Sequence, residues 1–293
     1  MSKVVIAGGT GFIGRLLEDA LKMKGHDVFI LTRSPKNINH IYWNPSAEEL
    51  DDDKIRDAEV IINLCGQGIA DARWTKERVD ELYNSRVLPL KFLAKATADW
   101  SNLKRVISAS GIDCYVRGIA EKAKEEEPFG NYMVANLVER WEKAIDELER
   151  DNVRVYKLRI AMVLHPQDGA IGKLLPVVKM GLASGLGTGK QIMNWIHWED
   201  LDRAIYHFMK EDVPSGAYNL CGNPVSNKDF MKNLASAKGK PFFMPNVPGF
   251  VLKLVYGELS ELLLQGRAAD NSKMKEAGFE FSYNTIEEAF ENF

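Results

Sequence analysis

The sequence predicts an α/β fold, in which a doubly wound parallel sheet is joined to a smaller, mainly helical C-terminal lobe. Short apolar runs alternate with helical patterns, as expected for parallel strands that are buried on both faces. The first apolar run, at 4–7, leads through a glycine-rich turn directly into an amphipathic helical pattern. Helical patterns predominate after residue 221. We therefore expect the sheet to be completed before that point.

The stretch from Lys3 to Gly14, KVVIAGGTGFIG, predicts a strand, a tight turn and a helix. Gly8 suits a backbone conformation that a Cβ would obstruct, and Gly11 leaves room for a diphosphate beside the main chain. The positive end of the new helix would face that diphosphate. The pattern indicates a dinucleotide-binding Rossmann fold. The expected cofactor contacts here are Gly8, Gly9, Thr10, Gly11, Phe12, Ile13 and Gly14.

Composition excludes several classes of partner. The 293 residues carry 38 basic and 41 acidic side chains, a net charge of −3, which offers no electrostatic surface for nucleic acid or an anionic membrane. Three separated cysteines suggest reduced thiols, and the histidines form no metal-binding set. The N-terminal apolar run is too short for a signal peptide, and no run is long enough to span a membrane. A cytoplasmic enzyme is the expectation.

The end of the second predicted strand, at 28–31, indicates which cofactor is bound. An NAD-binding protein usually presents a carboxylate there, whereas this chain has Thr32 and Arg33, and Asp27 lies at the other end of the strand. The Arg33 guanidinium can make a charge-assisted hydrogen bond to a 2′-phosphate. The alternative is an ordinary solvated arginine. We expect NADP(H).

Next along the chain, 40–43 could add an edge strand, and the acidic run at 48–53 is expected to be a solvated loop. The strand at 59–64 should end beside the glycine turn, which places Leu64 and Cys65 near the adenosine half of the cofactor. On the long helix predicted at 75–99, Glu81 and Arg86 are candidates for cofactor contacts. An exposed ion pair or a helix interface in a homodimer explains them equally well.

The next predicted strand, at 104–110, ends in small hydroxyl residues and leads into a charged segment at 111–130 that we expect to be a loop or lid. A helix at 131–150 and a strand at 153–160 follow, and Ile160 at the strand end is a further candidate for contact with the cofactor. The expected Rossmann domain is 1–165, with 191–220 returning to it. The segments 166–190 and 221–293 would form the substrate lobe.

These features together resemble the extended, epimerase-like branch of the short-chain dehydrogenase/reductase superfamily. The matching stretches are GGTGFIG at 8–14, NLCG at 63–66 and LRIAMVL at 158–164. NLCGQGI at 63–69, WIHWEDL at 195–201 and the segment from 245 onward are more specifically similar to a little-characterised subfamily of NAD-dependent epimerases and dehydratases. The resemblance extends over essentially the whole chain.

The resemblance implies a catalytic Ser, which corresponds to Ser110, and a Tyr that exchanges the proton, which corresponds to Tyr132. The Lys that lowers the Tyr pKa in the superfamily is replaced by Asn136. A free phenol has a pKa of about 10, and its ionisation at pH 7 costs about 4 kcal/mol. Since Asn136 is neutral, it cannot supply that free energy by charge. Tyr132 is therefore either an acid/base group or a packed helix-start residue.

In the same branch, the segment around Trp195 and His197 lines the substrate pocket, although a packed structural histidine is at least as good an interpretation. The leading hypothesis is an NADP(H)-dependent oxidoreductase or epimerase for a small polar substrate, with nucleotide sugars suggested by fold-level analogy. The alternative is a catalytically silent NADP(H)-binding protein that reports redox state.

Overall fold

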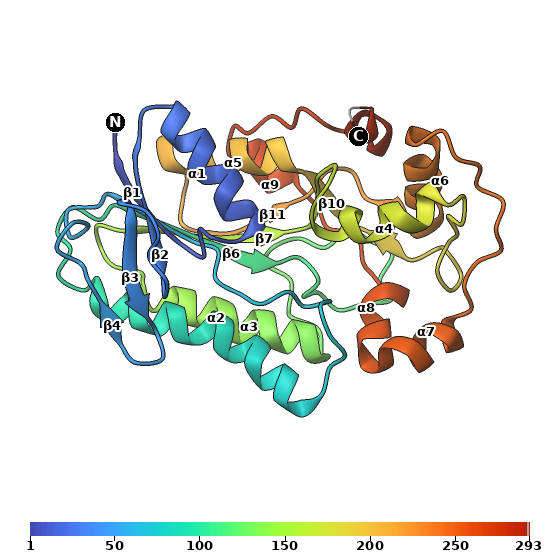
Figure 1. Ribbon diagram of the computed structural model, residues 1–293, viewed down its shortest axis with the longest axis horizontal. Helices are drawn as coiled ribbons and strands as arrows, with labels where there is room; N and C mark the ends of the chain where they lie inside the picture. Colours follow the sequence, from blue (N-terminus) through green and yellow to red (C-terminus); the bar gives the residue numbers. More distant parts are fainter. Residues whose placement is uncertain (292) are drawn as a thin grey trace.

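The computed structural model describes residues 1–291 and 293 of the chain, and its centre is one large sheet (Figure 1). The strands of this sheet are β1 (Lys3–Ala7), β2 (Asp27–Thr32), β3 (His40–Asn44), β4 (Glu49–Leu50), β5 (Val60–Asn63), β6 (Arg105–Gly111), β7 (Arg154–Ile160) and β11 (Gly216–Leu220). They lie in the order β11-β7-β6-β5-β1-β2-β3-β4. All neighbours are parallel except β3 and β4. The chain reverses its direction of winding at β1, and open α/β sheets bind ligands beside such a point.

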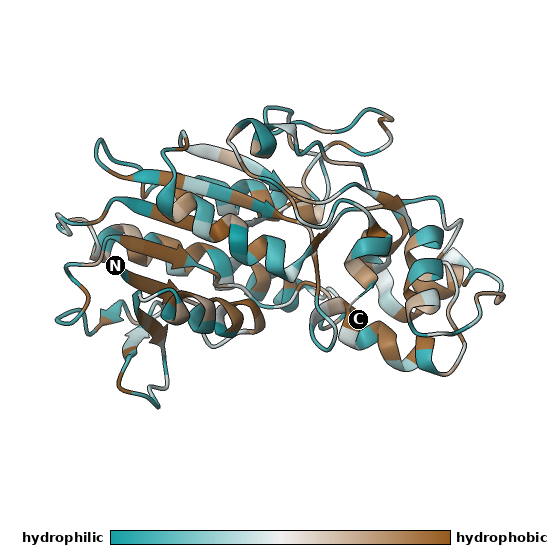
Figure 2. Ribbon diagram, turned by 90° about the horizontal axis from the view of Figure 1, so that it is seen from above, coloured by the Kyte–Doolittle hydropathy of each residue, from teal (hydrophilic) through white to brown (hydrophobic). Residues whose placement is uncertain are grey.

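Four long helices cover the two faces of the sheet. The four helices are α1 (Phe12–Met23), α2 (Lys76–Ala96), α3 (Met133–Asp146) and α5 (Trp198–Lys210). In Figure 1, α1 and α5 lie on one side and α2 and α3 lie side by side on the other. Along β1, Val4 and Ile6 pack in the cluster with α1 and α5, whereas Val5 and Ala7 pack in the cluster with α2 and α3. Both faces of the strand are therefore buried, as its unbroken apolar run predicts, and the brown central strands of Figure 2 show the same pattern.

Most of the remaining elements are gathered at the other end of the molecule, around or beside a third apolar cluster (Figure 1). The short helix α9 is the exception, because it packs against β11 and its Met274 belongs to the cluster with α1 and α5. Two small two-stranded sheets pair β10 with β8 and β12 with β9. These strands are β8 (Met162–Leu164), β9 (Ile192–Met193), β10 (Trp195–His197) and β12 (Val225–Ser226). The helices are α4 (Gly169–Lys179), α6 (Asn227–Ala237), α7 (Gly249–Tyr256), a 3-10 turn (Gly257–Leu259), α8 (Ser260–Leu264), α9 (Ser272–Glu276) and α10 (Ile286–Phe290).

The doubly wound sheet and the helical C-terminal region confirm the predicted fold class. The expected edge strand at 40–43 is β3, and part of the acidic run after it forms β4. The segment 111–130, expected to be a loop or lid, is held in place at its centre, because Ala123 is fully buried and exchanges backbone hydrogen bonds with the C-terminal segment at 268–270. No helix among the described residues is both long and apolar enough to cross a bilayer.

The candidate cofactor cleft

The glycine turn has the conformation that its sequence predicts. Gly8 adopts a positive φ of 79°, and a Cβ there would come within 2.7 Å of the Leu64 backbone. A Cβ on Gly14 would lie 2.5 Å from the Cα of Gly9, so α1 packs directly on the turn. No side chain caps α1, and its first turn contains no acidic residue. Its first N–H groups are consequently available to an anion.

A cleft of about 740 Å³ opens in front of this turn. Its lining comes from the glycine turn, the ends of β2 and β5, one side of α2 and the β3–β4 hairpin. The lining residues include Gly8, Thr10, Gly11, Thr32, Arg33, Ser34, Lys36, Asn44, Ser46, Leu64, Cys65, Gln67, Glu81 and Ser85. Burial raises the pKa of the Cys65 thiol to about 12, so this side chain contributes packing rather than a thiolate.

Basic residues mark the end of the cleft beside β2. Arg33 and Lys36 are both exposed and both line the cleft. Thr32 accepts a hydrogen bond from the Ser34 N–H at 3.2 Å, which shapes the turn between them. Asp27 is the first residue of β2 and lies at the opposite end of the strand. Lys36 and the hairpin were missed by the sequence analysis, although a second basic residue three positions after Arg33 is a signal that could have identified Lys36.

The two candidate residues on α2 lie differently. Glu81 lines the cleft and pairs with Arg78 at 2.9 Å, as the ion-pair alternative anticipated. Arg86 is buried, and its guanidinium donates to the carbonyl oxygens of Gln67 and Leu82 at 2.8 and 3.1 Å. Burial and the nearby Arg78 charge lower the Arg86 pKa to about 10. Arg86 therefore supports the loop that forms a wall of the cleft, and it is not among the lining residues.

Ser110 lies at the end of β6, where the sequence places it, but its hydroxyl faces a buried ion pair. Its Oγ donates to Glu142 Oε1 at 2.6 Å, and Glu142 in turn accepts from Arg159 at 2.8 and 2.9 Å. All three side chains are buried. The Ser110 hydroxyl proton is thus used in the hydrogen bond to Glu142. This bond argues against the expectation that the hydroxyl polarises a substrate oxygen. Ile160, at the end of the neighbouring β7, packs against the core and is not among the residues lining the cleft.

Tyr132 lies immediately before α3 and contacts two residues of the β6–α3 connection. Its phenol has one proton and two acceptors within hydrogen-bond distance, the Tyr115 carbonyl oxygen at 3.1 Å and Asp113 Oδ1 at 3.3 Å. The Arg117 guanidinium lies 3.7 Å from the centre of the phenol ring. Burial and the Asp113 carboxylate raise the Tyr132 pKa well above its ordinary value, despite the Arg117 charge. The surroundings of Tyr132 therefore favour its neutral form.

The two aromatic residues expected in the substrate pocket are buried instead. Trp195 is fully buried and its indole N–H donates to the Asn223 carbonyl oxygen at 2.7 Å. His197 caps α5 by accepting from the Glu199 N–H, and its ring lies 3.7 Å from that of Tyr283. Burial lowers the His197 pKa to about 4. This burial favours the packed structural histidine that the sequence left open, and the pocket assignment stays a prediction.

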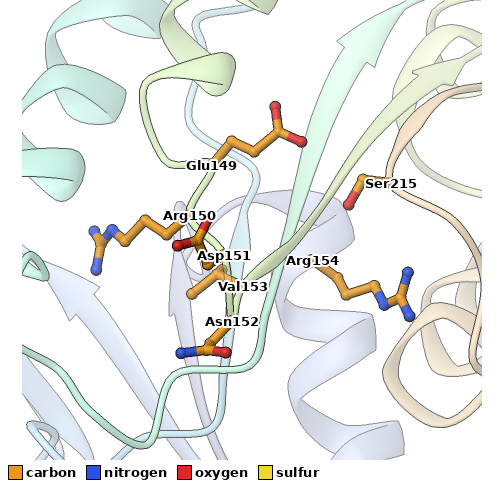
Figure 3. Close-up of a pocket in the computed structure, with 7 residues that line it drawn as sticks. All are labelled: Glu149, Arg150, Asp151, Asn152, Val153, Arg154 and Ser215. Atoms are coloured by element: carbon orange, nitrogen blue, oxygen red, sulfur yellow. The ribbon is translucent and has the colours of Figure 1, made fainter.

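A second hollow, of about 600 Å³, lies at the start of β7 (Figure 3). Figure 3 shows that its charged side chains diverge, with Arg150 and Arg154 pointing in opposite directions. Arg154 pairs with Asp212 at 2.6 Å, and the Arg154 side chain is partly exposed whereas that of Asp212 is largely exposed. Ligand sites need converging polar groups, so this hollow is not the candidate site.

The sheet order and the glycine turn before α1 define a Rossmann-type protein. Comparison with known sequences refines this class. The model of the NAD dependent epimerase/dehydratase family matches residues 4–221, so the chain belongs to that family. A domain of unknown function, DUF1731, matches residues 247–293. These findings confirm the family resemblance that the sequence motifs indicate.

The similar proteins cover nearly the whole chain. Epimerase family protein Mb2239 of Mycobacterium bovis is 34% identical over 98% of this chain and 95% of its own length. A crystal structure of human epimerase family protein SDR39U1 with NADPH has a TM-score of 0.91 and 27% identity, covering 99% of this chain and 98% of the human chain. The nucleoside-diphosphate sugar epimerase of Corynebacterium glutamicum has a TM-score of 0.76 and 28% identity, covering 98% of this chain and 57% of its own.

Proposed function

We propose that the protein binds NADP(H) in the 740 Å³ cleft and acts as an oxidoreductase or epimerase on a small polar substrate. The observation that carries the cofactor assignment is the pair of cations, Arg33 and Lys36, at one end of a cleft whose other end is the glycine turn. The human relative SDR39U1 was crystallised with NADPH, which supports the same choice. A nucleotide-sugar substrate is the finer proposal, prompted by the C. glutamicum relative.

The chain's own residues fit this cofactor. The first turn of α1 would hold the diphosphate with its uncapped N–H groups. Leu64, Cys65 and the β3–β4 hairpin would enclose the adenosine, and Arg33, Ser34 and Lys36 would surround the 2′-phosphate. A Cβ on Gly8 would meet the Leu64 backbone, so the turn can keep this shape only with glycine there. When bound, the nicotinamide would supply hydride transfer.

Calorimetry with NADPH and NADH tests the cofactor assignment. Arg33→Ala removes a charged hydrogen-bond donor that only the 2′-phosphate needs, so NADPH binding should weaken about 10- to 100-fold and NADH binding less than about threefold. Arg154→Ala, a partly exposed arginine in the second hollow, is the matched control and should change neither. Equal losses for both nucleotides in Arg33→Ala would refute the assignment.

A catalytically silent NADP(H)-binding protein is the second candidate function. It is favoured by the engaged Ser110 hydroxyl and by the neutral Asn136 at the Lys position. Hydride transfer from NADPH to a panel of carbonyl compounds and nucleotide sugars separates the two functions. Turnover supports the enzyme, whereas tight NADPH binding without any turnover supports the silent protein.

A further inference from the structure

Asp113, Arg117 and Tyr132 form a compact cluster just beyond the end of β6. Arg117 Nη2 donates to Asp113 Oδ2 at 2.7 Å, and the Tyr132 phenol lies 3.3 Å from the other carboxylate oxygen. Arg117 Nη1 also donates to Gln265 Oε1 at 3.3 Å. Since Gln265 follows α8, the cluster lies where the carboxyl edge of the sheet meets the C-terminal region. Substrate sites in open α/β sheets form at such an edge.

The environment of Asp113 differs from that of an exposed ion pair. Its side chain is 25% exposed and that of Arg117 is 11% exposed. Burial raises the Asp113 pKa, although the Arg117 cation and the Tyr132 hydrogen bond act in the opposite direction. The pKa of the Asp113 carboxyl group is therefore raised above that of an ordinary aspartate, and Arg117 lies beside it to stabilise the carboxylate.

We propose that Asp113 is the residue that exchanges a proton with the substrate, with Tyr132 as its hydrogen-bond donor and Arg117 as a positioning residue. The proposal rests on the proposed enzymatic function and deepens it. It follows from geometry, because Arg117 lies over the Tyr132 ring but hydrogen-bonds to Asp113, and Ser110 donates to Glu142. Asp113 touches both the phenol and the guanidinium. The phenol keeps its proton and orients one oxygen of the carboxyl group.

The proposed proton transfer completes the reduction of a carbonyl compound, with every atom and electron accounted for. Asp113 in its protonated form gives its O–H proton to the carbonyl oxygen, and that oxygen takes the electron pair of the breaking C=O π bond. The carbonyl carbon gains a hydrogen with two electrons from the reduced nicotinamide, which the proposed function supplies. Asp113 is left as a carboxylate beside Arg117 and regains a proton from water. In the reverse direction the carboxylate accepts the hydroxyl proton.

The experiment compares Asp113→Asn with wild-type protein on the same panel of carbonyl compounds and nucleotide sugars, with NADPH across a pH series. General acid–base catalysis is worth about 10²- to 10⁴-fold, so kcat should fall at least 100-fold. The pH dependence of kcat assigned to the carboxyl group should disappear. Asp212→Asn, an exposed ion-paired aspartate in a loop near the second hollow, should match the wild type. Tyr132→Phe should retain far more turnover than Asp113→Asn.

A binding measurement and a titration test the proposal without relying on turnover. NADPH affinity should be unchanged in Asp113→Asn, because the residue is not among those lining the cofactor cleft. In protein labelled with ¹³C at the Asp carboxyl carbons, Asp113 should give a resonance that titrates above the ordinary aspartate range, in addition to those of Asp200 and Asp202, whose pKa values are also raised. That resonance should be absent from Asp113→Asn and should titrate at higher pH still in Arg117→Met, which lacks the cation. If no such resonance exists, the proposal is wrong.

The remaining outcomes separate this proposal from the proposed function. If the wild type binds NADPH and Asp113→Asn keeps its turnover, Asp113 is not the proton-exchanging residue and the enzymatic function stands. If the wild type binds NADPH but reduces nothing, the Asp113 proposal falls and the silent protein is favoured. If the wild type does not bind NADPH, both the Asp113 proposal and the proposed function are wrong. Should Asp113→Asn fail to fold, Asp113→Glu replaces it, and an unchanged pH profile then overturns the proposal.

Discussion

At the scale of single residues, the clearest departure from the sequence expectation concerns Ser110. The hydroxyl that was expected to face a substrate donates instead to Glu142, which Arg159 holds through two further hydrogen bonds. Arg159 also donates to the Tyr115 hydroxyl at 2.9 Å and to the Glu125 carbonyl oxygen at 3.0 Å. Every polar group in this network has a partner nearby, which is the condition for burying a charge without a large desolvation cost.

Glu142→Ala should therefore destabilise the protein strongly. It leaves the Arg159 guanidinium buried without a counter-ion, and breaking a buried pair costs about 3–5 kcal/mol. Glu139→Ala, one turn earlier on α3, removes an exposed pair with Lys143 and should cost less than about 0.5 kcal/mol. Urea unfolding of both variants measures the difference. Similar free energies of unfolding for the two would contradict this account of the network.

At the scale of elements, the contact between α1 and α5 contains an unusual group. Asp202, on α5, faces a small apolar space lined by Ile13, Leu17 and Val163, and its Oδ1 has no hydrogen-bond partner within the described chain. Burial raises its pKa to about 6, against the attraction of Lys24. Since α1 also carries the uncapped N-terminus beside the cleft, this contact helps to set the position of that helix.

Asp202→Asn should stabilise the protein above pH 6. The folded state binds a proton more tightly than the unfolded state between pH 3.8 and 6, so wild-type stability falls as the pH rises through that range. Asn removes this loss, with an expected gain of about 1–2 kcal/mol at pH 7 once partial solvent exposure is allowed for, and none below pH 3.8. Thermal unfolding at several pH values measures this gain in stability. Asp80→Asn, at an exposed position on α2, is the control. A loss of stability at pH 7 would contradict the prediction.

At the scale of the whole molecule, the C-terminal region is attached to the sheet through buried polar contacts. Asn219 on β11 donates to the carbonyl oxygens of Ala123 and Asp270 at 3.2 and 2.9 Å, so it joins the sheet, the 111–130 segment and the C-terminal region. A contact between aromatic rings adds to these bonds, because His197, just before α5, packs against Tyr283. These contacts account for a single arrangement of parts that are far apart in the sequence.

His197→Asn tests one such contact through its pH dependence. The folded His197 has a pKa of about 4, whereas an unperturbed histidine has one of 6.5, so the unfolded state binds the additional proton. The contribution of His197 is complete above pH 6.5 and is lost as the pH falls toward 4, by about 3 kcal/mol in total. Asn can still cap α5, and it should flatten the stability profile over this range. Parallel profiles for the two proteins would show that His197 is not the responsible group.

Local chemistry explains how much the sequence could predict. The glycine turn and β2, with Arg33 after its end, depend on residues that are adjacent in the chain, and each is found where expected. The burial of Trp195 and His197 could not be predicted, because His197 packs against Tyr283, which lies far away in the sequence. The assignment of the cleft to NADP(H) and the role of Tyr132 stay predictions that the binding and turnover experiments address.

The sequence by itself determined the strand–turn–helix unit, the parallel sheet and the basic end of β2, because periodicity and glycine chemistry act over a few neighbouring residues. Only the tertiary structure decided that Ser110 faces Glu142 and that Asp113 meets both Arg117 and Tyr132. The physical reason is that hydrogen-bond direction and desolvation depend on which groups converge in space.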